Sequence, residues 1–275
     1  MLRLYIFLSF TVLLVSAVGC SLNRSFVSRS PSQILSSERS RLGVAALERG
    51  DLTEAEKRLE DAVKLSKNDV DYRRYYAEAL WQQGKHQEAL QQLNEAIKRG
   101  GQNSATLHVS LAEKYLTIRE YTTAYRHADE AVRLAPQDFR SWALRGRAKR
   151  MEAAYQAGYA EHTAALLHQA REDYLRALSL VPNDRELLAE LATVQMGCGQ
   201  LEQALATWLN VESLYPQGGE PMEVLIGKTE TLMVLQRFDE AEMCLSAIRQ
   251  CERRNLEAER RLQEMMTAAL GNIQR

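Results

Sequence analysis

A short motif recurs along this chain at intervals of 34 and 35 residues, and no other feature restricts the fold as strongly. The copies GDLTEAEKRLEDAV, GKHQEALQQLNEAI and REYTTAYRHADEAV begin at Gly50, Gly84 and Arg119, and weaker copies begin at Gly199 and Gln236. Every copy has an alanine at its sixth position. Self-similarity at this period predicts a solenoid, in which each unit buries its apolar face against its neighbours.

The apolar spacing within a copy is that of an α-helix. Ala55, Leu59 and Ala62 follow one another at i, i+4 and i+7, which places them on one helical face. Ala204 and Trp208 repeat this pairing of a small residue with a large one. The small residue lets two helices approach closely, and the large one fills the remaining gap. Glycine at the start of most copies favours the left-handed turn that ends a preceding helix.

In these features the chain resembles the tetratricopeptide repeat family over roughly residues 36–248. LAPQD at 134–138 and LVPND at 180–184 are similar to the ending of a family unit. The resemblance implies an all-α, right-handed α-solenoid of about six helix pairs plus a C-terminal capping helix. The solenoid would occupy residues 30–275, with units at 36–69, 70–104, 105–138, 139–184, 185–218 and 222–250.

Three segments depart from a regular repeat. Unit four carries an insertion within residues 149–169, whose Ala-rich composition predicts two lengthened helices that meet near Gly158. The apolar residues of 251–270 recur on one helical face, which predicts a capping helix for the last unit. Ser30 and Pro31 predict a helix start, with Ser as the cap and Pro at the first helical position.

The N-terminus predicts export. One Arg precedes the apolar run from Leu4 to Val18, whose 15 residues fall short of the about 20 needed for a membrane span. Small residues then lead to Cys20, and residues 17–20 resemble the box at which bacterial lipoproteins are acylated and cleaved, although Ala17 replaces the usual Leu, Val or Ile. We therefore predict a signal peptide at 1–19, lipidation of Cys20 and a flexible tether at 20–29.

Ser21, rather than Asp, follows the cysteine, which in that class is typical of outer-membrane lipoproteins. The expected location is thus the bacterial envelope, with the body facing the periplasm from the outer membrane. Cleavage without lipidation, giving a secreted or soluble periplasmic protein, and an uncleaved anchor are the alternatives.

Reactive chemistry is absent from the sequence pattern. The five His and four Cys have no zinc-ligand spacing, and no P-loop or G-x-S-x-G segment occurs. The near balance of 35 Lys+Arg with 36 Asp+Glu excludes the basic excess typical of nucleic-acid binders. RGRAKR at 145–150 is either a basic patch or a solvated helix face. We predict a non-enzymatic protein that needs no metal or cofactor.

Function is then expected on the concave groove lined by the first helix of each unit. The resemblance implies that certain positions within each unit face the groove. Trp81 is either an anchor for a partner or a packing residue. For Arg74 the alternative is a solvated charge paired with Glu78. The predicted partner-binding residues are Arg74, Glu78, Trp81, Glu113, Arg140, Arg147, Arg150, Glu230 and Met233.

Together these features predict a scaffold that binds a segment of another envelope protein, with assembly of an envelope, secretion or pilus machine as the narrower expected role. Similar lipoproteins of the family suggest that narrower role by analogy. The alternatives are an accessory subunit that positions peptidoglycan enzymes, and direct binding of cell-wall carbohydrate through Trp81.

Overall fold

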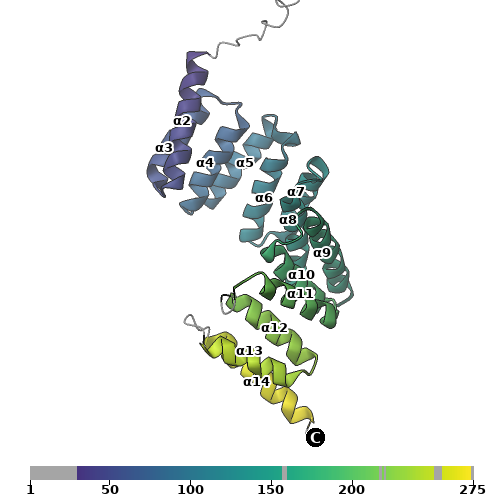
Figure 1. Ribbon diagram of the computed structural model, residues 1–275. Helices are drawn as coiled ribbons and strands as arrows, with labels where there is room; N and C mark the ends of the chain where they lie inside the picture. The colour runs from purple at the N-terminus through teal and green to yellow at the C-terminus, as the bar shows by residue number, and fades with distance from the viewer. Residues whose placement is uncertain (1–29, 157–159, 217–218, 220, 251–255, 274–275) are drawn as a thin grey trace, which may run out of the picture. The chain divides into compact units, whose positions relative to one another are not determined.

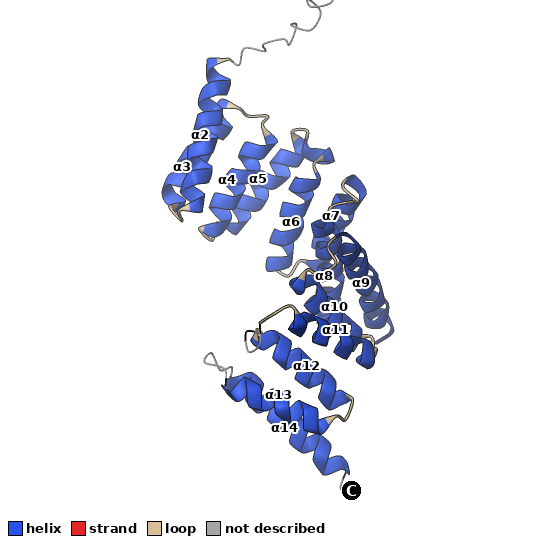
Figure 2. Ribbon diagram, in the orientation of Figure 1, coloured by secondary structure: helices blue, strands red, loops and turns tan. Residues whose placement is uncertain are grey.

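The computed structural model describes residues 30–156, 160–216, 219, 221–250 and 256–273. Within these ranges the chain forms thirteen α-helices and one 3-10 helix, and no strand (Figure 2). The expected all-α solenoid of helix pairs is confirmed. The chain divides into two compact units, one up to Gln83 and one from Gly84 onward, and each is described by itself.

The first unit holds three helices, and the second holds the rest (Figure 1). In the first they are α2 (Pro31–Glu48), α3 (Leu52–Leu65) and α4 (Val70–Gln82). In the second they are α5 (His86–Lys98), η1 (Gly101–Asn103), α6 (Ala105–Thr117), α7 (Tyr121–Leu134), α8 (Phe139–Tyr155), α9 (Ala160–Leu180), α10 (Arg185–Gly197), α11 (Leu201–Ser213), α12 (Met222–Val234), α13 (Phe238–Gln250) and α14 (Leu256–Ile273).

The first unit begins as its sequence predicts. Ser30 caps α2 by accepting from the backbone N–H of Gln33, whose side chain in turn accepts from the backbone N–H of Ser30. This reciprocal capping satisfies two backbone donors that a helix start leaves unpaired. Gly43 on α2 permits close approach to α3, since a Cβ there would lie 2.5 Å from Cγ of Leu59. Leu59 is accordingly buried between the helices.

In the second unit each helix packs on the next along the chain from α5 to α13, as expected for stacked helix pairs. The helices α8 and α9 have 17 and 21 residues, whereas most of the others have 13 or 14. Both helices of the pair with the insertion are thus lengthened, as predicted. Gly158, where they were expected to meet, lies outside the described residues.

Five tight turns between paired helices use a left-handed backbone conformation. Gly50, Gly84 and Gly199 have φ of 76°, 79° and 73°, which glycine adopts without steric cost. Arg119 and Gln236 occupy the same turn with φ of 65° and 60°. A side chain raises the energy of that conformation, so these two turns are held by the packing of the helices they join.

The C-terminal helix caps the last pair. α14 packs against α12 and α13 and buries Leu262 and Met266 against them (Figure 1). The predicted capping helix at 251–270 therefore forms, although residues 251–255 lie outside the described part. No helix among the described residues is long and apolar enough to cross a bilayer. Cys20, the predicted signal peptide at 1–19 and the predicted tether at 20–29 lie outside the described residues.

Candidate functional site

Side chains of α6, α8 and α10, each the first helix of a pair, surround a pocket of about 300 Å³ in the second unit. Its apolar wall combines nearly buried leucines with two half-buried residues, and charged residues form its rim. Glu113, Arg140 and Arg147 are predicted binding residues that the fold brings together here. The other lining residues are Phe139, Ala143, Leu144, Asp184, Glu186 and Leu187.

Local structure explains how these side chains come to face the pocket. Arg140 and Arg147 are seven residues apart on α8, so they lie on the same helical face two turns apart. Asp184 caps α10 by accepting from the backbone N–H of Leu187 at 2.9 Å. That cap starts α10 at the residue before Glu186, which places the Glu186 side chain opposite α8.

Arg147 joins α8 to α10 through two carboxylates. Its Nη2 lies 2.7 Å from Oε1 of Glu186, and its Nε lies 3.1 Å from Oε1 of Glu190. Glu190 also lies 2.8 Å from Nε of Arg150 and accepts from the Tyr174 hydroxyl at 3.2 Å. The side chain of Glu190 is 15% exposed, whereas that of Glu186 is 75% exposed. One partner of Arg147 is thus held within the fold and the other lies in solvent.

The titration properties of these groups follow from their neighbours. Burial lowers the pKa of Arg147, but Glu190 and the hydrogen bond to Glu186 outweigh it and raise the pKa above its usual value. Burial also lowers the pKa of Arg150, but the negative charge of Glu190 outweighs it, so the pKa of Arg150 is raised as well. Burial and the Glu190 charge raise the pKa of Tyr174. The two arginines therefore stay cationic, and the tyrosine stays a hydrogen-bond donor.

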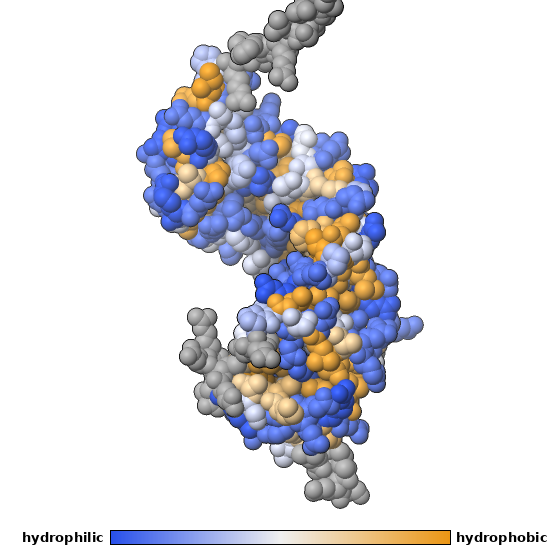
Figure 3. Space-filling view, in the orientation of Figure 1, coloured by the Kyte–Doolittle hydropathy of each residue, from blue (hydrophilic) through white to orange (hydrophobic). Residues whose placement is uncertain are grey.

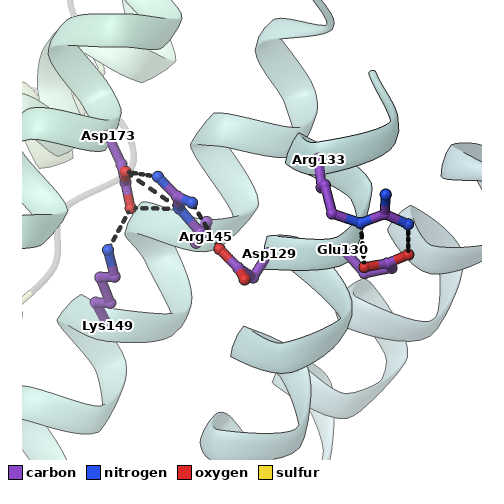
Figure 4. Close-up of polar contacts among 6 residues, drawn as sticks. All are labelled: Asp129, Glu130, Arg133, Arg145, Lys149 and Asp173. Atoms are coloured by element: carbon purple, nitrogen blue, oxygen red, sulfur yellow. Dashed lines mark hydrogen bonds and ion pairs between the residues drawn. The ribbon is translucent and has the colours of Figure 1, made fainter. Parts of the chain in front are cut away.

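A second ionic cluster fixes the opposite side of α8 (Figure 4). Arg145 donates through Nη2 to Asp173 of α9 at 2.7 Å and through Nη1 to Asp129 of α7 at 2.6 Å. Lys149 donates to the same Asp173 at 2.9 Å. Asp173 and Lys149 are almost fully buried. Removing one partner would leave a buried charge uncompensated, which is costly, so the cluster sets the orientation of α8.

The basic run at 145–150 is therefore neither a basic patch nor a solvated face. Arg145 and Lys149 pair with acidic groups of α7 and α9, and Arg147 and Arg150 pair with those of α10. Residues that are close in sequence can lie on different sides of a helix and contact different neighbouring helices. The expectation that the run forms one basic or solvated surface was therefore wrong.

The predicted binding residues that precede Gly84 all lie on α4. The Nε of Arg74 lies 3.5 Å from Oδ1 of Asp71, and its guanidinium lies 4.3 Å from the ring centroid of Tyr75. Glu78 accepts a hydrogen bond from the Gln82 side chain at 2.9 Å. Trp81 is half-buried. The ion pair seen for Arg74 is thus with the preceding turn, and not with Glu78 as the sequence suggested.

The two predicted residues of α12 lie beneath the capping helix rather than at the pocket. Met233 is 5% exposed and packs in the core cluster that contains Leu262 and Met266 of α14. Glu230 accepts from Nη2 of Arg261, also on α14, at 2.8 Å. Met233 is therefore part of the core in this structure, and Glu230 serves the packing of α14.

Sequence reasoning missed Glu186, Glu190 and the apolar lining of the pocket. Glu186 was within reach, because it is the second residue of the predicted unit 185–218 and lies on its first helix, and first helices were expected to line the groove. Glu190 had no such signal, since its role depends on Arg147, Arg150 and Tyr174 from two other helices. On the face in view in Figure 3, hydrophobic residues gather over α8 to α12 among hydrophilic ones.

The residues of the pocket suit recognition rather than reaction. Among the described residues, no three His, Cys, Asp or Glu side chains gather as a metal site. The polar groups at the rim are carboxylates and guanidinium groups, most of them already paired. Such a rim selects charged groups of a ligand, and the apolar wall contributes contact area.

Comparison with known proteins agrees with this architecture. The sequence profile of the tetratricopeptide repeat family matches residues 40–104. No curated protein sequence matches the chain. Solved structures similar to the chain include PilF of Pseudomonas aeruginosa, with 17% identity and a TM-score of 0.69 over 86% of this chain and 100% of that one.

Two further solved structures have a similar fold. PilW, described as a widely conserved type IV pilus biogenesis factor, has 17% identity and a TM-score of 0.64, over 78% of this chain and 91% of its own. MamA from Desulfovibrio magneticus has 20% identity and a TM-score of 0.57, over 67% of this chain and 96% of its own. At these identities the likeness concerns the fold alone.

Proposed function

We propose that the chain, whose residues 40–104 match the tetratricopeptide repeat family, is a non-enzymatic scaffold that binds a segment of another protein in the pocket between α6, α8 and α10. Repeat scaffolds of this kind bind along surfaces formed by successive units. The observation that carries the proposal is the pocket itself, which combines an apolar wall with a charged rim on three successive first helices.

We further propose that the scaffold works in a bacterial envelope, anchored through a lipid on Cys20. The short apolar run before the cysteine supports this, because it suits a cleaved export signal better than a membrane span. A role in assembling an envelope machine such as a pilus is supported by the likeness in fold to PilW, which is described as a type IV pilus biogenesis factor. The partner would then be another envelope protein.

Site-specific crosslinking in intact cells tests the proposal. A photoreactive benzoylphenylalanine replaces Glu113 on the pocket rim, and a matched chain carries it at Ala206, an exposed position of α11 outside the pocket. The Glu113 position should capture one discrete partner, and the Ala206 position should not. Mass spectrometry of the product separates a pilus or secretin component from a peptidoglycan enzyme.

A pocket-filling substitution shows whether the capture depends on the pocket. Ala143 is a half-buried wall residue, so Ala143→Leu should fill the space and abolish the crosslink from position 113. Ala206→Leu adds the same side chain on the surface of α11 and should leave the crosslink intact. Equal capture from both photoreactive positions, or capture that survives Ala143→Leu, contradicts binding at the pocket.

A further inference from the structure

We infer that the pocket takes an aliphatic side chain flanked by acidic residues, and that a carboxylate of the partner replaces Glu186 as the exposed partner of Arg147. This inference rests on the proposed function and names the chemistry of the segment that the pocket selects. It follows from three observations. Arg147 has two unequal ion pairs, Arg140 is exposed and has no ion pair within the described residues, and an apolar wall lies between the two arginines.

The two carboxylates on Arg147 are held unequally. Glu190 has three neighbours, namely Arg147, Arg150 and the Tyr174 hydroxyl, and its side chain is 15% exposed. Within the described residues Glu186 pairs with Arg147 alone, and its side chain is 75% exposed. An exposed ion pair contributes little to stability because water solvates both charges and side-chain entropy opposes the contact. Glu186 is therefore the partner that an incoming carboxylate displaces.

Arg140 supplies a second cation at the same rim. It is exposed, and within the described parts of the chain it has no ion pair; its guanidinium lies 5.9 Å from the Phe139 ring centroid. Two helical turns separate it from Arg147, a rise of about 10 Å along α8. In an extended segment alternate side chains share one face, so an apolar residue with acidic residues two positions before and two positions after it presents all three side chains to α8. The two acids are then about 13 Å apart, within reach of both flexible arginine side chains.

The pocket wall accounts for the apolar residue. Leu144 and Leu187 are 7% and 4% exposed, and Phe139 and Ala143 are half-buried around them. A volume of about 300 Å³ lies at the lower end of ligand pockets, which suits one or two side chains. None of these wall residues offers a side-chain hydrogen bond, so an aliphatic group is favoured over a polar one.

The acidic residues of the rim fix the orientation. Asp184 is already engaged in capping α10, and Glu113 lies across the pocket on α6. Like charges repel, so the carboxylates of the segment face α8, where the guanidinium groups of Arg140 and Arg147 are, and turn away from Glu113. A basic segment would instead be repelled by Arg140, which has no ion pair within the described residues.

Fluorescence anisotropy on the full chain tests this inference with three labelled peptides. The sequence GSGDSLSEGSG carries the acidic and aliphatic residues at alternate positions, GSGNSLSQGSG replaces the acids with amides, and GSGKSLSKGSG replaces them with lysines. The acidic peptide should bind, and the amide peptide should bind at least about fivefold more weakly, as expected for the loss of ion pairs. Equal binding of the acidic and amide peptides, or binding of none, overturns the inference.

Two exposed substitutions with opposite expected effects sharpen the test. Arg140→Gln removes the open cation and should weaken acidic-peptide binding about fivefold, whereas Glu186→Gln removes the internal competitor and should strengthen it severalfold. Lys98→Gln, on the surface of α5, changes the net charge as Arg140→Gln does and should leave binding unchanged. Weaker binding by Glu186→Gln, or an equal effect of Lys98→Gln, contradicts the proposed exchange.

The outcomes separate this inference from the proposed function. If the Glu113 position still captures a pocket-dependent partner while the acidic peptide shows no preference, the scaffold stands and the acidic chemistry is wrong. If the pocket-dependent capture is also lost, both fail. Circular dichroism of each variant confirms that the helical fold persists, as expected for substitutions of exposed side chains.

Discussion

At the scale of single residues, a histidine pair shows how the fold fixes proton positions. Nδ1 of His108 lies 3.1 Å from Nδ1 of His127, and Nε2 of His108 lies 3.2 Å from the carbonyl oxygen of Gln102. A carbonyl only accepts, so Nε2 of neutral His108 carries the proton and its Nδ1 accepts from His127. The Tyr115 ring stacks on His127 with centroids 5.6 Å apart. The His127 ring is thus held between His108 and Tyr115.

The pair predicts a loss of stability in mild acid. Burial, His108 and Arg126 lower the pKa of His127 to about 4, from an unfolded value of about 6.5. Between these values the unfolded chain binds a proton that the folded chain does not, so the free energy of unfolding falls as the pH drops through this window. Discounted for partial exposure of the ring, the loss is about 1–2 kcal/mol.

Urea denaturation at pH 7 and pH 4.5 measures this effect. His127→Gln removes the titrating ring and should reduce the difference in unfolding free energy between the two pH values by about the same amount. His162→Gln, on the exposed surface of α9, should behave as the wild type. An unchanged pH difference in His127→Gln would show that the histidine pair does not contribute.

At the scale of helices, close approach depends on small residues at fixed positions. Ala204 is fully buried on α11, and Trp208 one turn later is 3% exposed. Gly227 of α12 faces that tryptophan, since a Cβ there would lie 2.3 Å from Cζ2 of Trp208. The pairing of small with large side chains that the repeat predicted therefore acts both within a helix pair and between successive pairs.

Ala204→Glu tests this packing. The substitution places a carboxylate where the structure leaves no exposed surface, so the free energy of unfolding should fall by several kcal/mol. Ala206→Glu makes the same change two residues away at an exposed position of α11 and should cost less than about 0.5 kcal/mol. Thermal melts followed by circular dichroism compare them, and equal melting temperatures would refute the assigned helical face.

At the scale of the whole molecule, the chain combines repeat units with an N-terminal segment of a different character. Helices such as α3 and α7 carry charged and apolar residues on separate faces, whereas the segment before Ser30 begins with a nearly unbroken apolar run. The repeated helix pairs stack because each buries apolar surface on its neighbours. The helix α14 covers the last pair. The proposed anchor and the proposed binding pocket thus lie in separate parts of the chain.

Cys20→Ala tests the proposed anchor. Without the thiol no diacylglycerol is attached, so the variant should move from the membrane pellet to the soluble fraction after cell fractionation. Cys198→Ala, which changes a thiol on the folded body, should stay in the pellet with the wild type. Retention of Cys20→Ala in the membrane pellet would exclude lipid anchoring as the mode of attachment.

The sequence by itself determined the class of fold and where many helices begin and end. Periodicity, capping residues and left-handed turns act over a few neighbouring residues, so they can be read along the chain. Thus α4 begins at Val70 and α10 at Arg185, the positions where the repeat pattern starts its second and fifth units. Arg119 and Gln236 show that even a missing glycine does not remove such a turn when the helices on both sides pack.

Only the tertiary structure decided which side chains remain available to a partner. The sequence predicted Arg147 and Arg150 as cations open to a partner, but in the fold Glu186 and Glu190 of α10 pair with them. It predicted Met233 as exposed, but α14 covers it. The physical reason is that the free energy of an ion pair or an apolar contact depends on distance and solvent access between helices far apart in sequence. Local pattern does not contain that information, whereas the packed fold fixes it.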